Sequence, residues 1–184
     1  GLLQFSRVHY LAVLMMRTFS PGSYVLADHD ETFGSLIRTL SEPESGPHAD
    51  NLMTNEDSFP RVVGDLERRA TPGGVFLGVG PDQNFSYIAA SQPSLSFLLD
   101  YRRRNLRLHL FHKALFMLSE DRVAYLSRLM ARRPSTLPNN PSADQLVSAF
   151  MSAPFDKNLL ERTRIEAFGL IQALLVLDDS EWDD

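Results

Sequence analysis

The sequence predicts a helix-rich α/β fold of Rossmann type with a parallel sheet, and three observations within residues 73–105 predict it. Two short apolar runs, 75–79 and 95–99, have the length and composition of buried strands. The segment between them is long enough for one helix, over about 82–91. Glycines end the first run, and an acidic residue, Asp100, follows the second. A helix between two apolar strands forms a βαβ unit, in which the strands are parallel and the crossover is right-handed.

The composition is that of one globular domain. With 184 residues, of which 43% are hydrophobic and 22% charged, the chain can bury a substantial core. We expect a single domain with an N-terminal helical segment over 1–70, a βαβ core over 71–133 and C-terminal helices over 134–184. The net charge of −5 argues against nucleic-acid binding, which needs a basic face. The absence of cysteine excludes disulfides, thiolate zinc sites and cysteine nucleophiles.

The N-terminal part is predicted to be helical. Residues 2–19 are apolar and predict a helix that packs on the core and ends at 20–22. Charged residues interrupt this segment too often for a membrane span, so we expect no membrane partner and a cytoplasmic location, with a retained signal or anchor as the alternative. A second helix is predicted over 30–40, a loop over 41–49 and a third helix over 58–69. The inward residues of this third helix would be Val62, Val63 and Leu66.

Helices also follow the βαβ unit. One is predicted over 103–118, and Ser119 is predicted to cap the next, which ends near 132. A proline-rich linker or lid occupies 134–141. Ser142 is predicted to cap a short helix that ends at 152, and a last helix would begin at 158 or 159 and end near 177. The inward residues of the helix after Ser119 would be Val123, Leu126, Leu129 and Met130. The acidic tail that follows is expected to be solvated.

The chemistry of the βαβ unit lies where its first strand ends. Gly78-Val79-Gly80 permits a sharp turn and the close approach of a ligand, because glycine has no Cβ. The next helix starts near Gln83 and Asn84, where unpaired backbone N–H groups favour polar ligand atoms. Asp100 lies 22 positions after Gly78, where a carboxylate can accept hydrogen bonds from both hydroxyls of a ribose. The alternative is a strand-to-helix turn that binds nothing.

Gln83 distinguishes between kinds of nucleotide ligand. It stands where the dinucleotide fingerprint has its third glycine, so close packing of a pyrophosphate is not expected. Its amide suits a neutral or zwitterionic ligand better. The pattern therefore favours an adenosyl ligand, and a nicotinamide-dependent oxidoreductase is the weaker alternative.

Residues 41–133 resemble an uncharacterised bacterial family of class I S-adenosylmethionine methyltransferase-like proteins. The motifs that carry the resemblance are Asp50-Asn51-Leu52, Asn55-Glu56, the segment 78–85, the segment 100–105 and the helix 110–128. The resemblance implies S-adenosylmethionine as the cofactor, with Gly78 and Gly80 facing its methionine portion. It places Asp100 at the ribose and Tyr101 beside the adenine, with Asn55 and Glu56 closing the pocket. The predicted cofactor-binding residues are Asn55, Glu56, Gly78, Val79, Gly80, Gln83, Asn84, Asp100 and Tyr101.

The resemblance implies methyl transfer to an unknown small acceptor. No residue is assigned as catalytic, although Glu56 is the best candidate for a polar role near the methyl group. Phe76 stands where many methyltransferases carry an acidic residue, and only two strands are evident where the class I sheet has seven. Three alternatives stay open: the chain is a fragment, further segments complete the sheet, or the unit has lost its enzymatic half. A non-catalytic scaffold or subunit that works by partner binding is therefore the second functional hypothesis.

Three weaker clusters have ordinary explanations. The polar residues 50–57 suit turn and capping chemistry as well as a ligand-facing loop. His109 and His112 have no carboxylate one turn further on, so packing or a polar contact with the sheet is expected in place of a metal site. The arginines of 102–107 are expected to form ion pairs at the surface, with Asp100 and Asp82 among the candidates, and contact with an anionic substrate is the alternative.

Overall fold

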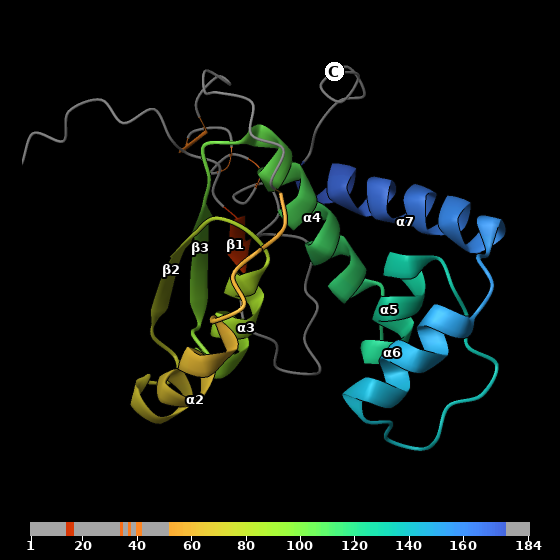
Figure 1. The fold of residues 1–184 in the computed structure, drawn as a ribbon. Coiled ribbons are helices and arrows are strands. Elements are labelled where there is room, and N and C mark those ends of the chain that lie inside the picture. The colour runs from red at the N-terminus through yellow and green to blue at the C-terminus, as the bar shows by residue number, and fades with distance from the viewer. Residues whose placement is uncertain (1–13, 17–33, 35–36, 38–39, 42–51, 176–184) are drawn as a thin grey trace, which may run out of the picture. The chain divides into compact units, whose positions relative to one another are not determined.

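The chain forms two compact units. The computed structural model describes residues 14–16, 34, 37, 40–41 and 52–175 (Figure 1). Unit 1 comprises Gly1–Leu110 together with Leu174–Asp184, and unit 2 comprises Phe111–Ala173. None of the helices within the described ranges is long and apolar enough to cross a membrane.

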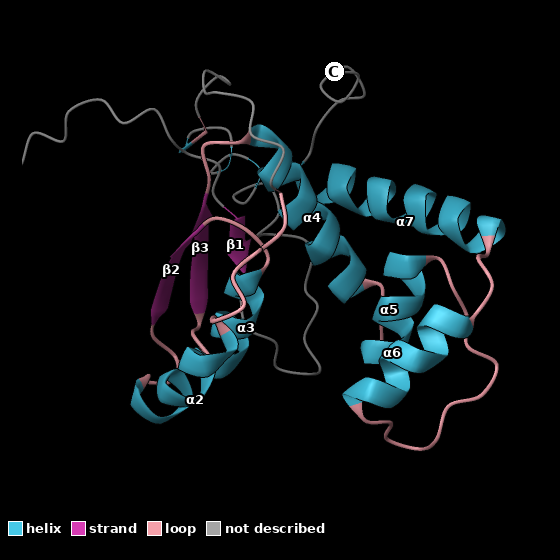
Figure 2. Cartoon of the chain, in the orientation of Figure 1, coloured by secondary structure: helices cyan, strands magenta, loops and turns pink. Residues whose placement is uncertain are grey.

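Unit 1 contains the predicted βαβ unit. Strands β2 (Val75–Val79) and β3 (Leu95–Leu99) are parallel, and helix α3 (Gln83–Ser91) connects them (Figure 2). Strand β1 (Leu14–Met16) pairs antiparallel with the other side of β3, so the sheet order is β1-β3-β2. The prediction of a helix-rich α/β structure with parallel strands is confirmed. In the part of the chain that the structure describes, the sheet has two parallel strands and does not amount to a full Rossmann methyltransferase sheet.

The N-terminal helix prediction is wrong for residues 14–16. An apolar run without glycine or proline is compatible with a helix and with a buried strand. Here the free edge of β3 supplies the backbone hydrogen-bond partners of a strand. The remainder of the predicted helix over 2–19 lies outside the described residues. In the predicted helix over 30–40, residues 34, 37 and 40 are helical, and Gly34 and Ile37 are buried.

Helix α2 (Pro60–Arg69) confirms the predicted helix over 58–69, with Pro60 in its first turn. It packs against α3, where the rings of Phe59 and Tyr87 meet edge to face at 6.2 Å. Val62, predicted to point inward, is 46% exposed, because the helix contacts its neighbour along a narrower stripe than the apolar pattern suggested.

The two faces of β2 differ in what covers them. Gly78 is buried against Asn84 of α3, whereas the side chains of the opposite face are about two-thirds exposed. These exposed residues, which we call the open β2 face, are Val75, Leu77 and Val79. Parallel strands are normally covered on both faces, so three exposed aliphatic side chains on one face are unusual.

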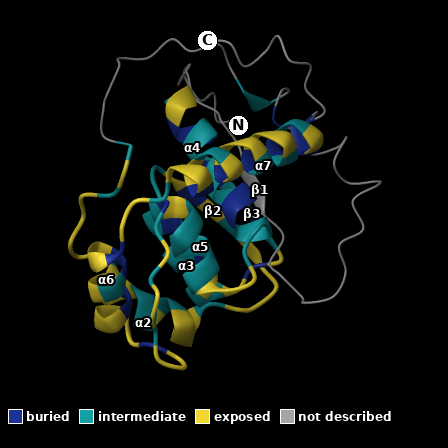
Figure 3. Cartoon of the chain, turned by 90° about the vertical axis from the view of Figure 1, so that its right-hand side faces the viewer, coloured by how far each residue is buried: buried dark blue, intermediate teal, exposed yellow. Residues whose placement is uncertain are grey.

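Four helices form the remainder of the described chain. Helix α4 (Arg103–Met117) leads from unit 1 into unit 2, and α5 (Arg122–Met130), α6 (Ala143–Ser152) and α7 (Lys157–Leu175) follow. Buried residues recur every three or four positions along α6 and α7, with exposed residues between them, as in amphipathic helices (Figure 3). The largest buried side chains of unit 2 include Leu115 and Phe150. Leu129, predicted to be inward, is 40% exposed.

The helix caps confirm one sequence prediction and correct another. The Ser142 side chain accepts a hydrogen bond from the Gln145 N–H, and the Gln145 side-chain oxygen accepts one from the Ser142 N–H. Helix α6 therefore begins with a capping box. Ser119, predicted to cap α5, does not do so. Asp121 takes that role and accepts from the Ala124 N–H at 2.8 Å, because the chain continues for two residues beyond Ser119 before it turns helical.

Candidate functional site

The predicted turn and the predicted acid lie at the same edge of the sheet. Val79 and Leu99 are paired residues at the ends of β2 and β3, and the Gly80 N–H donates to the Leu99 carbonyl at 2.9 Å. Gly80 has a φ of +90°, in the region that residues with a Cβ rarely adopt. Asp100 follows Leu99 directly and is 5% exposed. The structure therefore brings together the glycine turn and the carboxylate that the sequence singled out.

Gly78 is required for contact between β2 and α3. A Cβ on Gly78 would lie 2.2 Å from the Asn84 Oδ1 atom and 2.6 Å from the Phe76 ring. The Asn84 side chain cannot retreat easily, since it is only 2% exposed. Gly78 thus serves helix packing, and it is Gly80 that makes the turn.

Asn84 holds the turn together from inside. Its Nδ2 group lies 3.1 Å from the Val79 carbonyl, 3.3 Å from that of Gly80 and 2.9 Å from that of Pro81. These hydrogen bonds join three carbonyls where the strand ends and the helix begins; the Gly80 carbonyl also contacts the His109 Nε2 group, and the Pro81 carbonyl also accepts from the Asn84 N–H. The amide that the sequence placed among the cofactor-binding residues is engaged with the backbone.

Asp100 is enclosed by its own chain. Its carboxylate accepts from the Arg102 backbone N–H at 2.8 Å, from the Arg102 Nε and Nη2 groups at 2.9 and 2.8 Å, and from the Asn105 Nδ2 group at 2.5 Å. Four hydrogen bonds fill the acceptor positions of a carboxylate. A ribose at this point would have to replace some of them.

Burial and hydrogen bonding act in opposite directions on Asp100. Burial alone would raise the pKa of the carboxyl, but the hydrogen bonds from Arg102 and Asn105 outweigh it, and the pKa is lowered. The hydrogen bond to Asp100 correspondingly raises the pKa of Arg102. The Arg102 guanidinium also lies 5.3 Å from the centre of the Tyr101 ring, which it can hold by a cation–π contact.

His109 of α4 also contacts the turn, and the sequence predicted this contact only in part. The sequence predicted that one histidine of α4 packs or contacts the sheet, and the His109 Nε2 group meets the Gly80 carbonyl at 3.0 Å. Because a carbonyl can only accept, Nε2 carries the proton, and Nδ1 is buried without a partner among the described residues. The Phe85 ring meets the imidazole edge to face at 5.5 Å. Burial lowers the pKa of His109 despite the Gly80 carbonyl.

This buried imidazole predicts a loss of stability in mild acid. The folded chain resists protonating His109, while the unfolded chain accepts a proton near pH 6.5, so protons favour unfolding below that value. We expect the free energy of unfolding to fall between pH 7.5 and pH 5.5, and to fall less in His109→Gln. Urea denaturation followed by circular dichroism at both pH values measures the difference. An equal decrease in both proteins would contradict this origin of the pH dependence.

A polar contact that the sequence did not predict links the segment before α2 to the turn after β2. The Thr54 N–H donates to the Asp82 carboxylate at 2.7 Å, and the Thr54 hydroxyl contacts the Gln83 side chain. Asn55 and Glu56, predicted to close a pocket, are exposed. The segment that contains them lies next to the turn, where Thr54 makes the contacts with Asp82 and Gln83.

The comparisons with known proteins cover the same part of the chain. Residues 52–138 match the family model described as a domain of unknown function (DUF7790), which includes the whole βαβ unit. No curated protein and no solved structure matches. The description of the family names no activity, so the resemblance to methyltransferase-like proteins stays a prediction. Within the described ranges, no group of three histidine or acidic residues is placed to hold a metal ion.

Proposed function

We propose that the β2–α3–β3 unit binds S-adenosylmethionine and that the chain is a methyltransferase-like protein acting on an unknown small acceptor. The observation that carries the proposal is the placement of Gly80 and Asp100 at paired ends of two parallel strands. Gly80 offers an approach free of a Cβ, with nothing within 4 Å of the Cβ position, and Asp100 offers a carboxylate for a ribose.

Ribose binding would require Arg102 to move. The Arg102 side chain is 12% exposed at the edge of the site, whereas Asn105 is fully buried. Withdrawal of the guanidinium would release two of the four hydrogen bonds to Asp100, one on each oxygen, and leave those from the Arg102 N–H and from Asn105. Two ribose hydroxyls could then take the vacated positions. Tyr101, next in the chain, is the proposed neighbour of the adenine.

Methyl transfer is an in-line displacement at carbon. S-adenosylmethionine, held by the turn at Gly80 and by Asp100 and Tyr101, would supply an electrophilic methyl group to a lone pair of the acceptor, with a neutral thioether as the leaving group. Positioning of the two reactants supplies most of the rate enhancement in such a step. We assign no residue as a base, and Glu56 is proposed only as a polar neighbour of the methyl group.

Calorimetric titration tests the proposal. We expect saturable binding of S-adenosylmethionine and S-adenosylhomocysteine, weakened at least tenfold in Asp100→Asn, because the neutral amide accepts less strongly from ribose. Asp65→Asn, on the exposed surface of α2, is the control and should bind as the unchanged protein does. Absence of heat at millimolar ligand, or binding that survives Asp100→Asn unchanged, would contradict the ribose assignment.

The open β2 face favours a second candidate, a non-catalytic scaffold that works by binding a partner. Val75, Leu77 and Val79 are 67%, 66% and 71% exposed. Contiguous aliphatic exposure of this kind often marks an interaction surface. This candidate predicts that millimolar S-adenosylmethionine leaves the thermal midpoint unchanged, while the cofactor proposal predicts an increase.

A further inference from the structure

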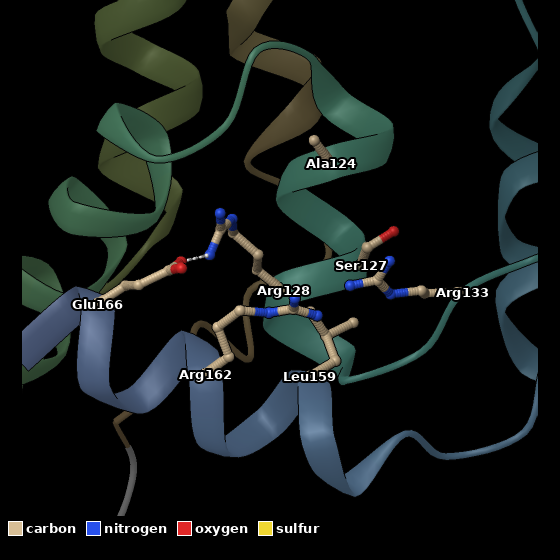
Figure 4. A pocket seen from close by; sticks show the side chains of 7 residues that line it. All are labelled: Ala124, Ser127, Arg128, Arg133, Leu159, Arg162 and Glu166. Carbon is tan, nitrogen blue, oxygen red and sulfur yellow. Dashed lines mark hydrogen bonds and ion pairs between the residues drawn. The ribbon is translucent and has the colours of Figure 1, made fainter.

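Unit 2 contains a pocket with charged side chains in its lining, and none of its residues belongs to the glycine turn. It has a volume of about 360 Å³ and lies between α5 and the N-terminal half of α7 (Figure 4). Helix α5 contributes Ala124, Ser127 and Arg128, with Arg133 just beyond its end. Volumes of this order are typical of small-molecule sites.

The lining of the pocket from α7 repeats along one helical face. Leu159, Arg162 and Glu166 are three and four residues apart, so they lie one above the other. Together with Arg128 and Arg133, the lining carries three guanidinium groups and one carboxylate, and with Asp156, which pairs with Arg133, the local charge is +1. That local charge stands out in a chain whose net charge is −5. A pocket of this charge attracts anions.

The walls of the pocket are fixed by contacts within unit 2. Ala131 ends α5 in the left-handed conformation, and its carbonyl accepts from the Asp156 N–H at 2.8 Å. The Asp156 side chain in turn caps α7 by accepting from the Leu159 N–H at 2.9 Å. The end of α5 and the start of α7 are therefore joined at one point. The three arginines project from a framework that exists before any ligand arrives.

Two of the arginines are oriented by carboxylates and retain further donors. Arg128 meets Glu166 through Nη1 at 2.5 Å, and Arg133 meets Asp156 through Nε at 3.5 Å. A guanidinium has five N–H donors, so each keeps several for a ligand. Figure 4 shows the Arg128 side chain extending toward Glu166 and away from Arg133.

Arg162 lies between these two and is exposed. Among the residues that the structure describes, it has neither a hydrogen bond nor an ion pair. The Ser127 hydroxyl adds a neutral donor, and the buried Leu159 side chain and Ala124 supply an apolar wall. Guanidinium groups match the oxygens of a phosphate in pairs, which a spherical anion such as chloride cannot exploit.

We propose that this pocket binds a small phosphorylated molecule, with Arg162 and Arg133 as the principal ligands of its phosphate and Arg128 held ready by Glu166. The space exceeds that of a single phosphate, so a diphosphate or a phosphate ester fits better than the inorganic ion. The inference concerns unit 2 alone and does not depend on the proposed function of unit 1.

Titration of the full chain with pyrophosphate in 150 mM NaCl tests the proposal, with inorganic phosphate and adenosine diphosphate as further probes. We expect saturable binding of pyrophosphate that Arg162→Gln weakens at least tenfold. Arg164→Gln is the matched control, because Arg164 lies on the same helix, is 74% exposed, pairs with Glu161 and does not line the pocket. Tighter binding of adenosine diphosphate than of pyrophosphate would identify a nucleotide ligand, and equal binding would identify the phosphate groups alone.

Two outcomes would overturn the proposal. One is the absence of saturable binding to all three probes at millimolar concentration. The other is equal weakening by Arg162→Gln and Arg164→Gln, which would mean that the probes respond to surface charge and not to the pocket. Circular dichroism of both variants shows that the fold is retained, which is expected because the Arg162 side chain makes no contact on which the fold depends.

Discussion

Replacing Gly78 by alanine is expected to lower the free energy of unfolding by about 2–3 kcal/mol, since overpacking a well-filled contact costs this order of energy. The added methyl group would lie 2.2 Å from the Asn84 Oδ1 atom, so α3 or the Asn84 side chain must shift. Such a shift also disturbs the contacts of Asn84 with the carbonyls of the turn. Urea denaturation followed by circular dichroism measures the change.

Gly64→Ala provides the control within the same unit. Gly64 lies inside α2, and a Cβ there would meet the Arg68 side chain at an ordinary 3.5 Å. Alanine in a helix interior is favoured over glycine by roughly 0.5–1 kcal/mol, so this variant should be slightly stabilised. Equal stability of the Gly78 and Gly64 variants would show that β2 and α3 do not pack as closely as described.

Asp100→Ala is expected to lower the free energy of unfolding by about 3–5 kcal/mol, the usual cost of removing one partner of a buried ion pair. It leaves the Arg102 guanidinium, at 12% exposure, without its carboxylate, and it removes the acceptor of the Asn105 amide. Asn105 is fully buried and cannot turn to water. Urea denaturation at pH 7 measures the loss.

The pH dependence of this contribution has a definite sign. The pKa of Asp100 is lowered in the folded chain, so its stabilisation is present above about pH 4 and is lost as the pH falls through the folded value. The control is Asp65→Ala, which breaks an exposed pair with Arg68 and should cost at most about 0.5 kcal/mol. Similar losses in the two variants would contradict the buried network.

The local pattern of the sequence was sufficient for the βαβ unit. Two short apolar runs, the first ended by glycines and the second by Asp100, predicted both parallel strands with the bounds observed, because these features act over a few residues. Strand β1 could not be predicted in this way. Its pairing with β3 joins residues about eighty positions apart, and only that long-range contact decides between helix and strand.

In the candidate site, too, local features could be predicted from the sequence, whereas contacts that depend on the folded conformation could not. The sequence located Gly80 and Asp100 at strand ends. It could not show that Arg102 and Asn105 donate hydrogen bonds to the Asp100 carboxylate and occupy its acceptor positions. The sequence shows that they follow Asp100 by two and five residues, but it does not show the backbone conformation that brings both side chains to the carboxylate. The pocket of unit 2 was missed entirely. Arg128 and Arg162 come from different helices, and no local motif links them.

The open β2 face also bears on how the protein behaves at high concentration. In the described part of the chain β2 pairs only with β3, so its other edge offers unpaired N–H and C=O groups beside three exposed aliphatic side chains. An edge with these properties is a template for strand addition between molecules. Self-association through β2 is therefore expected when this chain is concentrated, and a charged side chain in place of Leu77 would oppose it.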